Sequence, residues 1–245
     1  MKILVSENQF KFLVNLITEN DDRVKENVMF VGDSLSTGGK TWNYLLAKAH
    51  PDWNVTHVVE GGKKTDWMLS NMLPKLKEKK YDKVFIYGGT NDAFWVGTNL
   101  SNAVTNIQKM VDVVNEQGGQ AYVFLGYEAG SVMTDKNLKP TKYPDGRVLC
   151  DQNCMYKGRE RMIQLQKDLS SQIKNAIIIP TVSGDGNWSA GDGIHIGPSN
   201  HKTIKDHVES YIKETKKTNQ TQTTGNTNDN KKEKFKKFFE RYFEF

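Results

Sequence analysis

Short apolar runs alternate with longer segments in which apolar residues recur every three or four positions. The runs predict strands buried on both faces, and the longer segments predict amphipathic helices. The predicted strands are 28–31, 55–59, 84–87, 121–125 and 177–179, and the predicted helices are 42–49, 65–79, 101–116, 159–173 and 200–213. Strands that alternate with helices predict a parallel sheet covered on both faces. We therefore expect a three-layer α/β/α fold around a flavodoxin-like, five-stranded parallel sheet.

Two details qualify this pattern. Pro74 lies inside the helix predicted at 65–79 and is expected to kink or split it, because proline lacks the N–H that the helix needs. Residues 127–155, rich in Gly, Pro and Asp, predict an irregular insertion between the fourth strand and the next helix. The insertion follows a strand, so we expect it to shape the site.

The α/β domain is expected to span residues 23–214, preceded by an N-terminal appendage at 1–22. Within the appendage, a short strand at 1–5 is followed by Ser6 and Gln9, which form a capping-box pattern ahead of a helix. Residues 215–230 are dominated by Thr, Asn, Gln and Lys, which predicts a disordered linker.

Residues 231–245 change character again. Aromatic residues recur there at helical spacing and basic residues take the other positions, which predicts a basic amphipathic helix. Such a helix either packs back on the body or docks in a partner's groove or on an anionic surface, and the sequence leaves both open.

Charge excludes one function class for the body. The chain of 245 residues has a net charge of +5, and residues 215–245, with eight Lys/Arg and four Asp/Glu, hold +4 of it. The remaining +1 does not predict nucleic-acid binding. No stretch approaches the roughly 18 apolar residues of a membrane span, and 1–7 is too short for a secretory signal, so we expect a cytoplasmic location or, for a phage protein, a virion.

The two cysteines do not form a disulfide framework. Cys150 and Cys154 are read as free thiols in preference to a pair, and no histidine lies near them at zinc-ligand spacing. We expect neither metal nor cofactor.

The candidate nucleophile is Ser34, in the stretch Gly32-Asp33-Ser34-Leu35 directly after the first predicted strand. A serine at the carboxyl end of a parallel strand lies at the edge where ligands bind. A Gly-Asp-Ser stretch on its own is more often a plain turn, so the assignment depends on the rest of the chain.

The chain supplies the other parts of a serine hydrolase. His195 is the candidate base and Asp192, three residues earlier, can orient its imidazole. The backbone N–H groups of Ser34 and Gly62 and the side-chain amide of Asn91 are candidate oxyanion donors. Taken singly, His195 could be a capping or surface histidine, Gly62 a strand-end turn and Asn91 an Asx turn.

Together these four blocks resemble the SGNH hydrolases, also called GDSL esterases and lipases, in order and spacing over residues 27–213. The resemblance implies Ser34 as nucleophile, His195 as base, Asp192 as its orienter, and Gly62 and Asn91 as oxyanion donors. It also implies the three-layer fold. The second block departs from the family pattern: it reads Glu60-Gly61-Gly62-Lys63-Lys64, which makes Gly61 a rival of Gly62 and places two lysines near the site.

The family includes lipid esterases, thioesterases and carbohydrate O-acetylesterases, so the substrate needs other clues. Trp67, Trp95 and Trp188 lie close in sequence to the catalytic blocks, where indoles could stack on sugars, although core positions suit tryptophan at least as well. No long apolar lid is evident. We therefore expect a serine esterase that removes a small acyl group, acetyl above all, from a carbohydrate or cell-wall glycan.

Two alternatives remain. The chain could hydrolyse lipid esters or lysophospholipids at a membrane surface, or it could be an interaction protein that docks through 231–245. Residues 1–16 resemble short leaders of tailed-phage proteins, which would place the protein in a virion acting on host surface esters, with the C-terminal helix as its dock.

Overall fold

The computed structural model describes residues 3–4, 25–95, 98–128, 141–142, 148–150, 152–182, 194–223 and 243–244, without side chains for 3–4, 141–142, 148–150, 152–156, 214–223 and 243–244. The chain divides into two compact units. One comprises Glu26–Glu209 and the other comprises Met1–Lys25 with Ser210–Phe245. The larger unit contains the sheet and the candidate site.

The centre of the larger unit is a five-stranded, all-parallel sheet. Its strands are β2 (Glu26–Gly32), β3 (Trp53–Val59), β4 (Lys83–Tyr87), β5 (Gln120–Phe124) and β8 (Ile177–Ile179). They lie in the order β3-β2-β4-β5-β8, and Val31 of β2 is in register with Val58 of β3 and Ile86 of β4. This order is the flavodoxin-like one, so the fold predicted from the sequence is confirmed.

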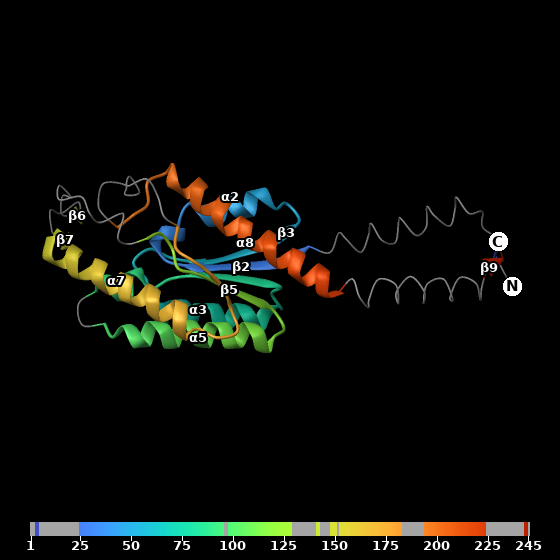
Figure 1. The fold of residues 1–245 in the computed structure, drawn as a ribbon, viewed down its shortest axis with the longest axis horizontal. Coiled ribbons are helices and arrows are strands. Elements are labelled where there is room, and N and C mark those ends of the chain that lie inside the picture. The colour runs from blue at the N-terminus through green and yellow to red at the C-terminus, as the bar shows by residue number, and fades with distance from the viewer. Residues whose placement is uncertain are drawn as a thin grey trace. The chain divides into compact units, whose positions relative to one another are not determined.

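Helices cover both faces of the sheet. They are α2 (Trp42–Ala49), α3 (Thr65–Glu78), α4 (Thr90–Phe94), α5 (Leu100–Glu116), α7 (Gln152–Gln172) and α8 (Asn200–Thr223), with a 3₁₀ turn η1 (Ser34–Ser36) after β2. Figure 1 shows α3, α5 and α7 on one side of the sheet and α2 with the first part of α8 on the other. This arrangement satisfies the two-sided burial that the apolar runs predict.

The two faces of the sheet have different cores. On one face, aliphatic side chains such as Met29, Val84 and Ile86 pack in one buried cluster with residues of α3, α5 and α7. On the other, Phe30 stacks on Phe85 with ring centroids 5.2 Å apart, and the aromatic packing extends to residues of α2. Both faces exclude water, so the strand order and register are firmly specified.

Two helices differ from the sequence prediction. Pro74 does not split α3, which runs through it as one helix; the side chain is exposed, so water can bond the carbonyl that the missing N–H leaves free. Helix α8 extends to Thr223, ten residues past its predicted end. The linker predicted at 215–230 is therefore helical up to Thr223, because no Gly or Pro interrupts the chain between Asn200 and Gly225.

Part of the predicted insertion at 127–155 is regular. Strands β6 (Thr141–Lys142) and β7 (Val148–Cys150) pair in antiparallel fashion, and α7 begins at Gln152. The rest of the insertion between 129 and 147 lies outside the described residues.

In the smaller unit, β1 (Ile3–Leu4) pairs in parallel with β9 (Phe243–Glu244), which places a strand where the sequence predicts one at 1–5. Phe243 and Glu244 are strand residues, contrary to the helix predicted at 231–245. The rest of that helix, the linker beyond Thr223 and the helix of the appendage lie outside the described residues and stay predictions. Among the described helices, none is both long and apolar enough to cross a membrane.

Candidate active site

The candidate residues meet where the strand order reverses. The chain passes from β2 to β3 on one side of the sheet and returns to β4 on the other, so the carboxyl ends of β2 and β4 form a topological switch point. Ser34 follows β2, Gly61 follows β3 and Asn91 follows β4. Ligands of open parallel sheets bind at such a crevice.

The side chains of Ser34 and His195 are in contact there. Nε2 of His195 lies 3.0 Å from Oγ of Ser34, although the two residues are 161 positions apart in the sequence. With Nε2 unprotonated, the serine hydroxyl donates to the imidazole, which is the arrangement a general base requires.

The loop that carries His195 is anchored on both sides of the imidazole. Ile194 and Ile196 are buried, while His195 itself is half-buried. The hydroxyl of Tyr127, three residues past the end of β5, donates to the carbonyl of Ile194 over 2.8 Å in a buried position. The packing of Ile194 and Ile196 and the hydrogen bond from Tyr127 therefore hold the ring near Ser34.

The nucleophile turn is fixed by its neighbours. Asp33 caps η1, and its Oδ1 accepts from the N–H of Leu35 over 3.0 Å. Gly32 is required because a Cβ there would lie 2.6 Å from Oγ of Ser36. The start of α2 holds the far side of the turn, since Nδ2 of Asn43 donates to the carbonyl of Ser36 over 2.9 Å. Ser34 thus lies on a turn with little freedom to move.

The residue that caps this turn, Asp33, has a buried carboxyl. Asp33 is fully buried, and burial raises its pKa to about 6, while the N–H of Leu35 and the nearby His195 lower it. Its Oδ2 and the hydroxyls of Thr90 and Tyr87 have no partner at hydrogen-bond distance among the described residues. Such unpartnered buried oxygens are costly and so concentrate at functional sites.

Asn91 is oriented as a donor. Its Nδ2 donates to the carbonyl of Lys63 over 2.9 Å, and its Oδ1 accepts from Nε1 of Trp95 over 3.4 Å. These two contacts fix the orientation of the side-chain amide, with Nδ2 as donor and Oδ1 as acceptor. They leave the second N–H of Nδ2 without a partner in the described part of the chain, available for an oxyanion.

The structure places both glycines of the second block near the turn. A Cβ built on Gly61 would lie 3.7 Å from Cβ of Ser34, so Gly61 adjoins the nucleophile. Gly62 has a φ of +74°, a left-handed conformation that favours glycine, and a Cβ there would meet nothing within 4 Å. Either backbone N–H stays a candidate donor.

The lysines of this block pair with two of the three candidate tryptophans, Trp67 and Trp95. Nζ of Lys63 lies 5.7 Å from the ring centroid of Trp67 and 3.0 Å from Oε1 of Glu60. Nζ of Lys64 lies 5.6 Å from the ring centroid of Trp95. Trp67 packs partly against the core, whereas Trp95 is 50% exposed. Trp95 is thus the better of the two for stacking on a ligand.

Two predicted site residues, Asp192 and Trp188, lie outside the described residues, so their roles stay predictions. His50 has Nε2 3.8 Å from Oε1 of Glu209. His50 directly follows α2 and Glu209 lies on α8, so this pair belongs to the packing of these helices.

Sequence reasoning missed the supporting roles of Asp33 and Tyr127. Asp33 stood in the recognised motif but was not assigned a function of its own. Tyr127 gave one weak signal: it has a polar tip and follows within three residues of a buried strand, at the same sheet edge as the candidate residues.

The sequence matches no protein-family model and no curated protein. The fold is similar to several solved structures. TesA is 19% identical, with 77% of this chain and 98% of that chain covered and a TM-score of 0.56. A lipolytic protein of the G-D-S-L family from Veillonella parvula is 16% identical, covering 76% and 97%, with a TM-score of 0.55.

The acetyl xylan esterase AlAXEase is 14% identical, with 76% of this chain and 99% of that chain covered and a TM-score of 0.53. Each of these chains is covered almost completely, so the likeness extends over their whole fold. The α/β unit of this chain therefore has the fold of the SGNH (GDSL) hydrolases, the family that its sequence blocks resemble.

Proposed function

We propose that this chain is a serine esterase that removes a small acyl group, acetyl above all, from a carbohydrate. The observation that carries the proposal is the 3.0 Å contact between Oγ of Ser34 and Nε2 of His195 at the switch point of the sheet. The similarity in fold to structures titled as a lipolytic protein and an acetyl xylan esterase supports the same reaction type.

The proposed reaction has two halves. His195 takes the proton of the Ser34 hydroxyl while Oγ bonds to the ester carbonyl carbon, and the carbonyl oxygen becomes an oxyanion. The free N–H of Asn91 and backbone N–H groups of Ser34 and of Gly61 or Gly62 stabilise that charge. When the tetrahedral intermediate collapses, the C–O bond to the carrier breaks and the leaving alcohol takes the proton from His195.

A water molecule then completes the turnover. His195 removes a proton from the water as its oxygen attacks the acyl-serine carbonyl, and collapse releases the acid while Ser34 regains its proton. Asp192 is proposed to accept from Nδ1–H of His195 and so to stabilise the imidazolium in both halves.

The primary test compares wild type with Ser34→Ala on p-nitrophenyl acetate. We expect the variant to lose at least about 10³-fold in kcat, as for loss of a serine nucleophile. Ser70→Ala, an exposed serine on α3, is the matched control and should keep wild-type rates. Equal rates for wild type and Ser34→Ala would refute serine catalysis.

A second series addresses the substrate. Esters from acetate to octanoate, followed by acetate release from acetylated xylan and O-acetylated peptidoglycan, separate a deacetylase from a lipid esterase. We expect kcat/KM to fall with acyl chain length. A rise with chain length would favour the lipid-esterase alternative.

A further inference from the structure

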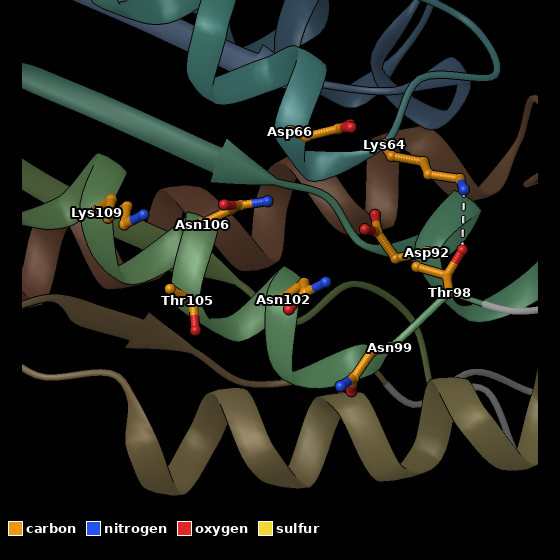
Figure 2. Close-up of a pocket in the computed structure, with 9 residues that line it drawn as sticks. All are labelled: Lys64, Asp66, Asp92, Thr98, Asn99, Asn102, Thr105, Asn106 and Lys109. Atoms are coloured by element: carbon orange, nitrogen blue, oxygen red, sulfur yellow. Dashed lines mark hydrogen bonds between the residues drawn. The ribbon is translucent and has the colours of Figure 1, made fainter.

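A polar cavity of about 480 Å³ lies beside the candidate active site and contains neither Ser34 nor His195. Its lining residues come from the start of α3 and the residue before it, from α4, from the segment between α4 and α5, and from α5 itself (Figure 2): Lys64, Asp66, Asp92, Thr98, Asn99, Asn102, Thr105, Asn106 and Lys109. It is joined to the site through two chain neighbours, because Lys64 and Asp92 directly follow Lys63 and Asn91.

Every residue of this lining is polar. Ligand pockets of this size are usually lined mostly by apolar and aromatic side chains. An acyl chain placed here would cover polar groups without giving them hydrogen bonds, which is unfavourable. A ligand rich in hydroxyl groups, which both donate and accept, satisfies amides, hydroxyls and an ammonium equally well.

The floor of the cavity is already satisfied. Asp92 accepts from the backbone N–H and the hydroxyl of Thr65, each over 3.0 Å, and Nδ2 of Asn106 donates to the same hydroxyl over 3.2 Å. Lys64 donates to Thr98 over 2.9 Å (Figure 2). These groups already bond to one another and form a rigid base, so they do not need a ligand to complete their hydrogen bonds.

The wall on α5 is different. The side chains of Asn102, Thr105 and Lys109 are exposed and have no hydrogen-bond or ion-pair partner among the described residues. Their spacing of three and four places them in one stripe along the helix, over about 10 Å at 1.5 Å per residue. The free groups therefore comprise an amide, a hydroxyl and one ammonium, arranged in a line.

The direction of α5 relates this line to the active site. The helix connects the carboxyl end of β4 to the amino end of β5, so it starts at the edge where Asn91 lies and runs away from it. Asn102 is the member of the line closest to the site, and Lys109 is the farthest. A linear ligand held along α5 would lead toward Ser34.

We propose that this cavity, lined by the stripe of Asn102, Thr105 and Lys109 on α5, is a binding subsite for the carbohydrate chain that carries the ester. It binds sugars that flank the one whose acyl group reaches Ser34. The inference rests on the proposed esterase function. It adds where the carrier binds and which residues select it: Asn102, Thr105 and Lys109 donate to or accept from sugar hydroxyls, and none of them touches the reacting atoms.

The test uses three forms of the full chain. The triple variant Asn102→Ala/Thr105→Ala/Lys109→Ala removes the free groups while keeping good helix formers. Thr105→Trp fills the cavity instead. Ser101→Ala/Glu116→Ala changes two exposed residues of the same helix that are outside the lining and is the matched control.

With acetylated xylan as substrate, we expect the triple variant and Thr105→Trp to raise KM about tenfold or more, with kcat on p-nitrophenyl acetate unchanged in both. The control should match wild type on both substrates. An unchanged KM on the polymer in both cavity variants would overturn the subsite.

Binding without turnover separates this inference from the esterase proposal. Affinity electrophoresis of the Ser34→Ala chain in gels that contain acetylated xylan or O-acetylated peptidoglycan should show retardation, which the triple substitution abolishes. The subsite is overturned if neither polymer retards the Ser34→Ala chain. It is also overturned if retardation is equal with and without the triple substitution. Inactivity of wild type toward p-nitrophenyl acetate would overturn the esterase proposal alone.

Discussion

The indole N–H of Trp95 lies 3.4 Å from Oδ1 of Asn91, one turn earlier on the chain. The backbone reinforces this contact, because the N–H of Trp95 donates to the carbonyl of Asn91 over 3.0 Å. An asparagine amide can rotate by 180° and exchange its donor for its acceptor. Trp95 and the Lys63 carbonyl together select the orientation in which Nδ2 is free to donate.

Trp95→Phe should therefore slow the chemical step. We expect kcat on p-nitrophenyl acetate to fall about three- to tenfold with little change in KM, because the ring remains and only the N–H to Asn91 is lost. Trp67→Phe is the matched control, since Trp67 also lies under a lysine but has no contact with Asn91. In an Asn91→Ala background the Trp95 substitution should have no further effect; additive losses would mean that Trp95 acts elsewhere.

Tyr127 should matter for activity through the His195 loop. Removing its hydroxyl in Tyr127→Phe leaves the buried carbonyl of Ile194 without this donor, which should lower the free energy of unfolding by about 1–3 kcal/mol. Loosening the loop should also lower kcat. Tyr81→Phe also removes a tyrosine hydrogen bond, to Thr56, but away from the site. Urea unfolding and p-nitrophenyl acetate kinetics on both variants check this, and a Tyr127→Phe enzyme with unchanged kcat would contradict it.

The sheet and the pairing of Ser34 with His195 could be predicted because they follow from hydrophobic pattern and topology. The apolar runs Val28–Val31 and Val84–Tyr87 are uninterrupted and fully buried, as is typical of central strands of a parallel sheet. Once the strands are parallel, the loops after them must share one edge, whatever their separation in the chain. Topology thus brings segments 161 residues apart to one edge, and the four sequence blocks single out Ser34 and His195 within them.

The polar cavity could not be predicted, because a ligand-facing polar residue and a solvent-facing one look alike in a sequence. Asn102, Thr105 and Lys109 fit the solvated side of an amphipathic helix, and only the position of α3 beside α5 turns that side into a wall. The end of α8 was missed for a related reason. Thr, Asn, Gln and Lys suit a linker and also continue an existing helix, so composition alone does not choose between them.

Gly61 and Gly62 should respond differently to alanine. Gly62→Ala places a side chain on a left-handed backbone with a φ of +74° and should destabilise the fold by about 1–2 kcal/mol. Gly61→Ala meets only an ordinary contact at 3.7 Å from Cβ of Ser34, so stability should change little while the added methyl group narrows the space beside the nucleophile. Thermal unfolding separates the two, and a larger loss for Gly61→Ala would contradict the observed backbone conformation.

The buried carboxyl of Asp33 should make stability depend on pH. Because burial raises its pKa from 3.8 to about 6, the folded protein keeps this proton at a pH where the unfolded chain has lost it. Ionising Asp33 in the folded state therefore costs free energy. The cost is absent below pH 3.8, grows between pH 3.8 and about 6, and is constant above that range.

Asp33→Asn removes this cost and keeps an oxygen that can accept from the N–H of Leu35. Relative to wild type, the variant should gain up to about 3 kcal/mol in its free energy of unfolding between pH 4 and pH 7.5, the equivalent of the difference between 3.8 and about 6. This figure already includes the attraction of His195 and the repulsion from Asp92, because both contribute to the pKa of about 6. Asp82→Asn makes the same substitution at an exposed carboxyl that accepts from the N–H of Asn27, and is the matched control. Urea unfolding of both variants across this range checks the sign. If the stability advantage of Asp33→Asn over wild type shrinks as the pH rises, the folded state favours the carboxylate. A partner must then compensate the burial of its charge.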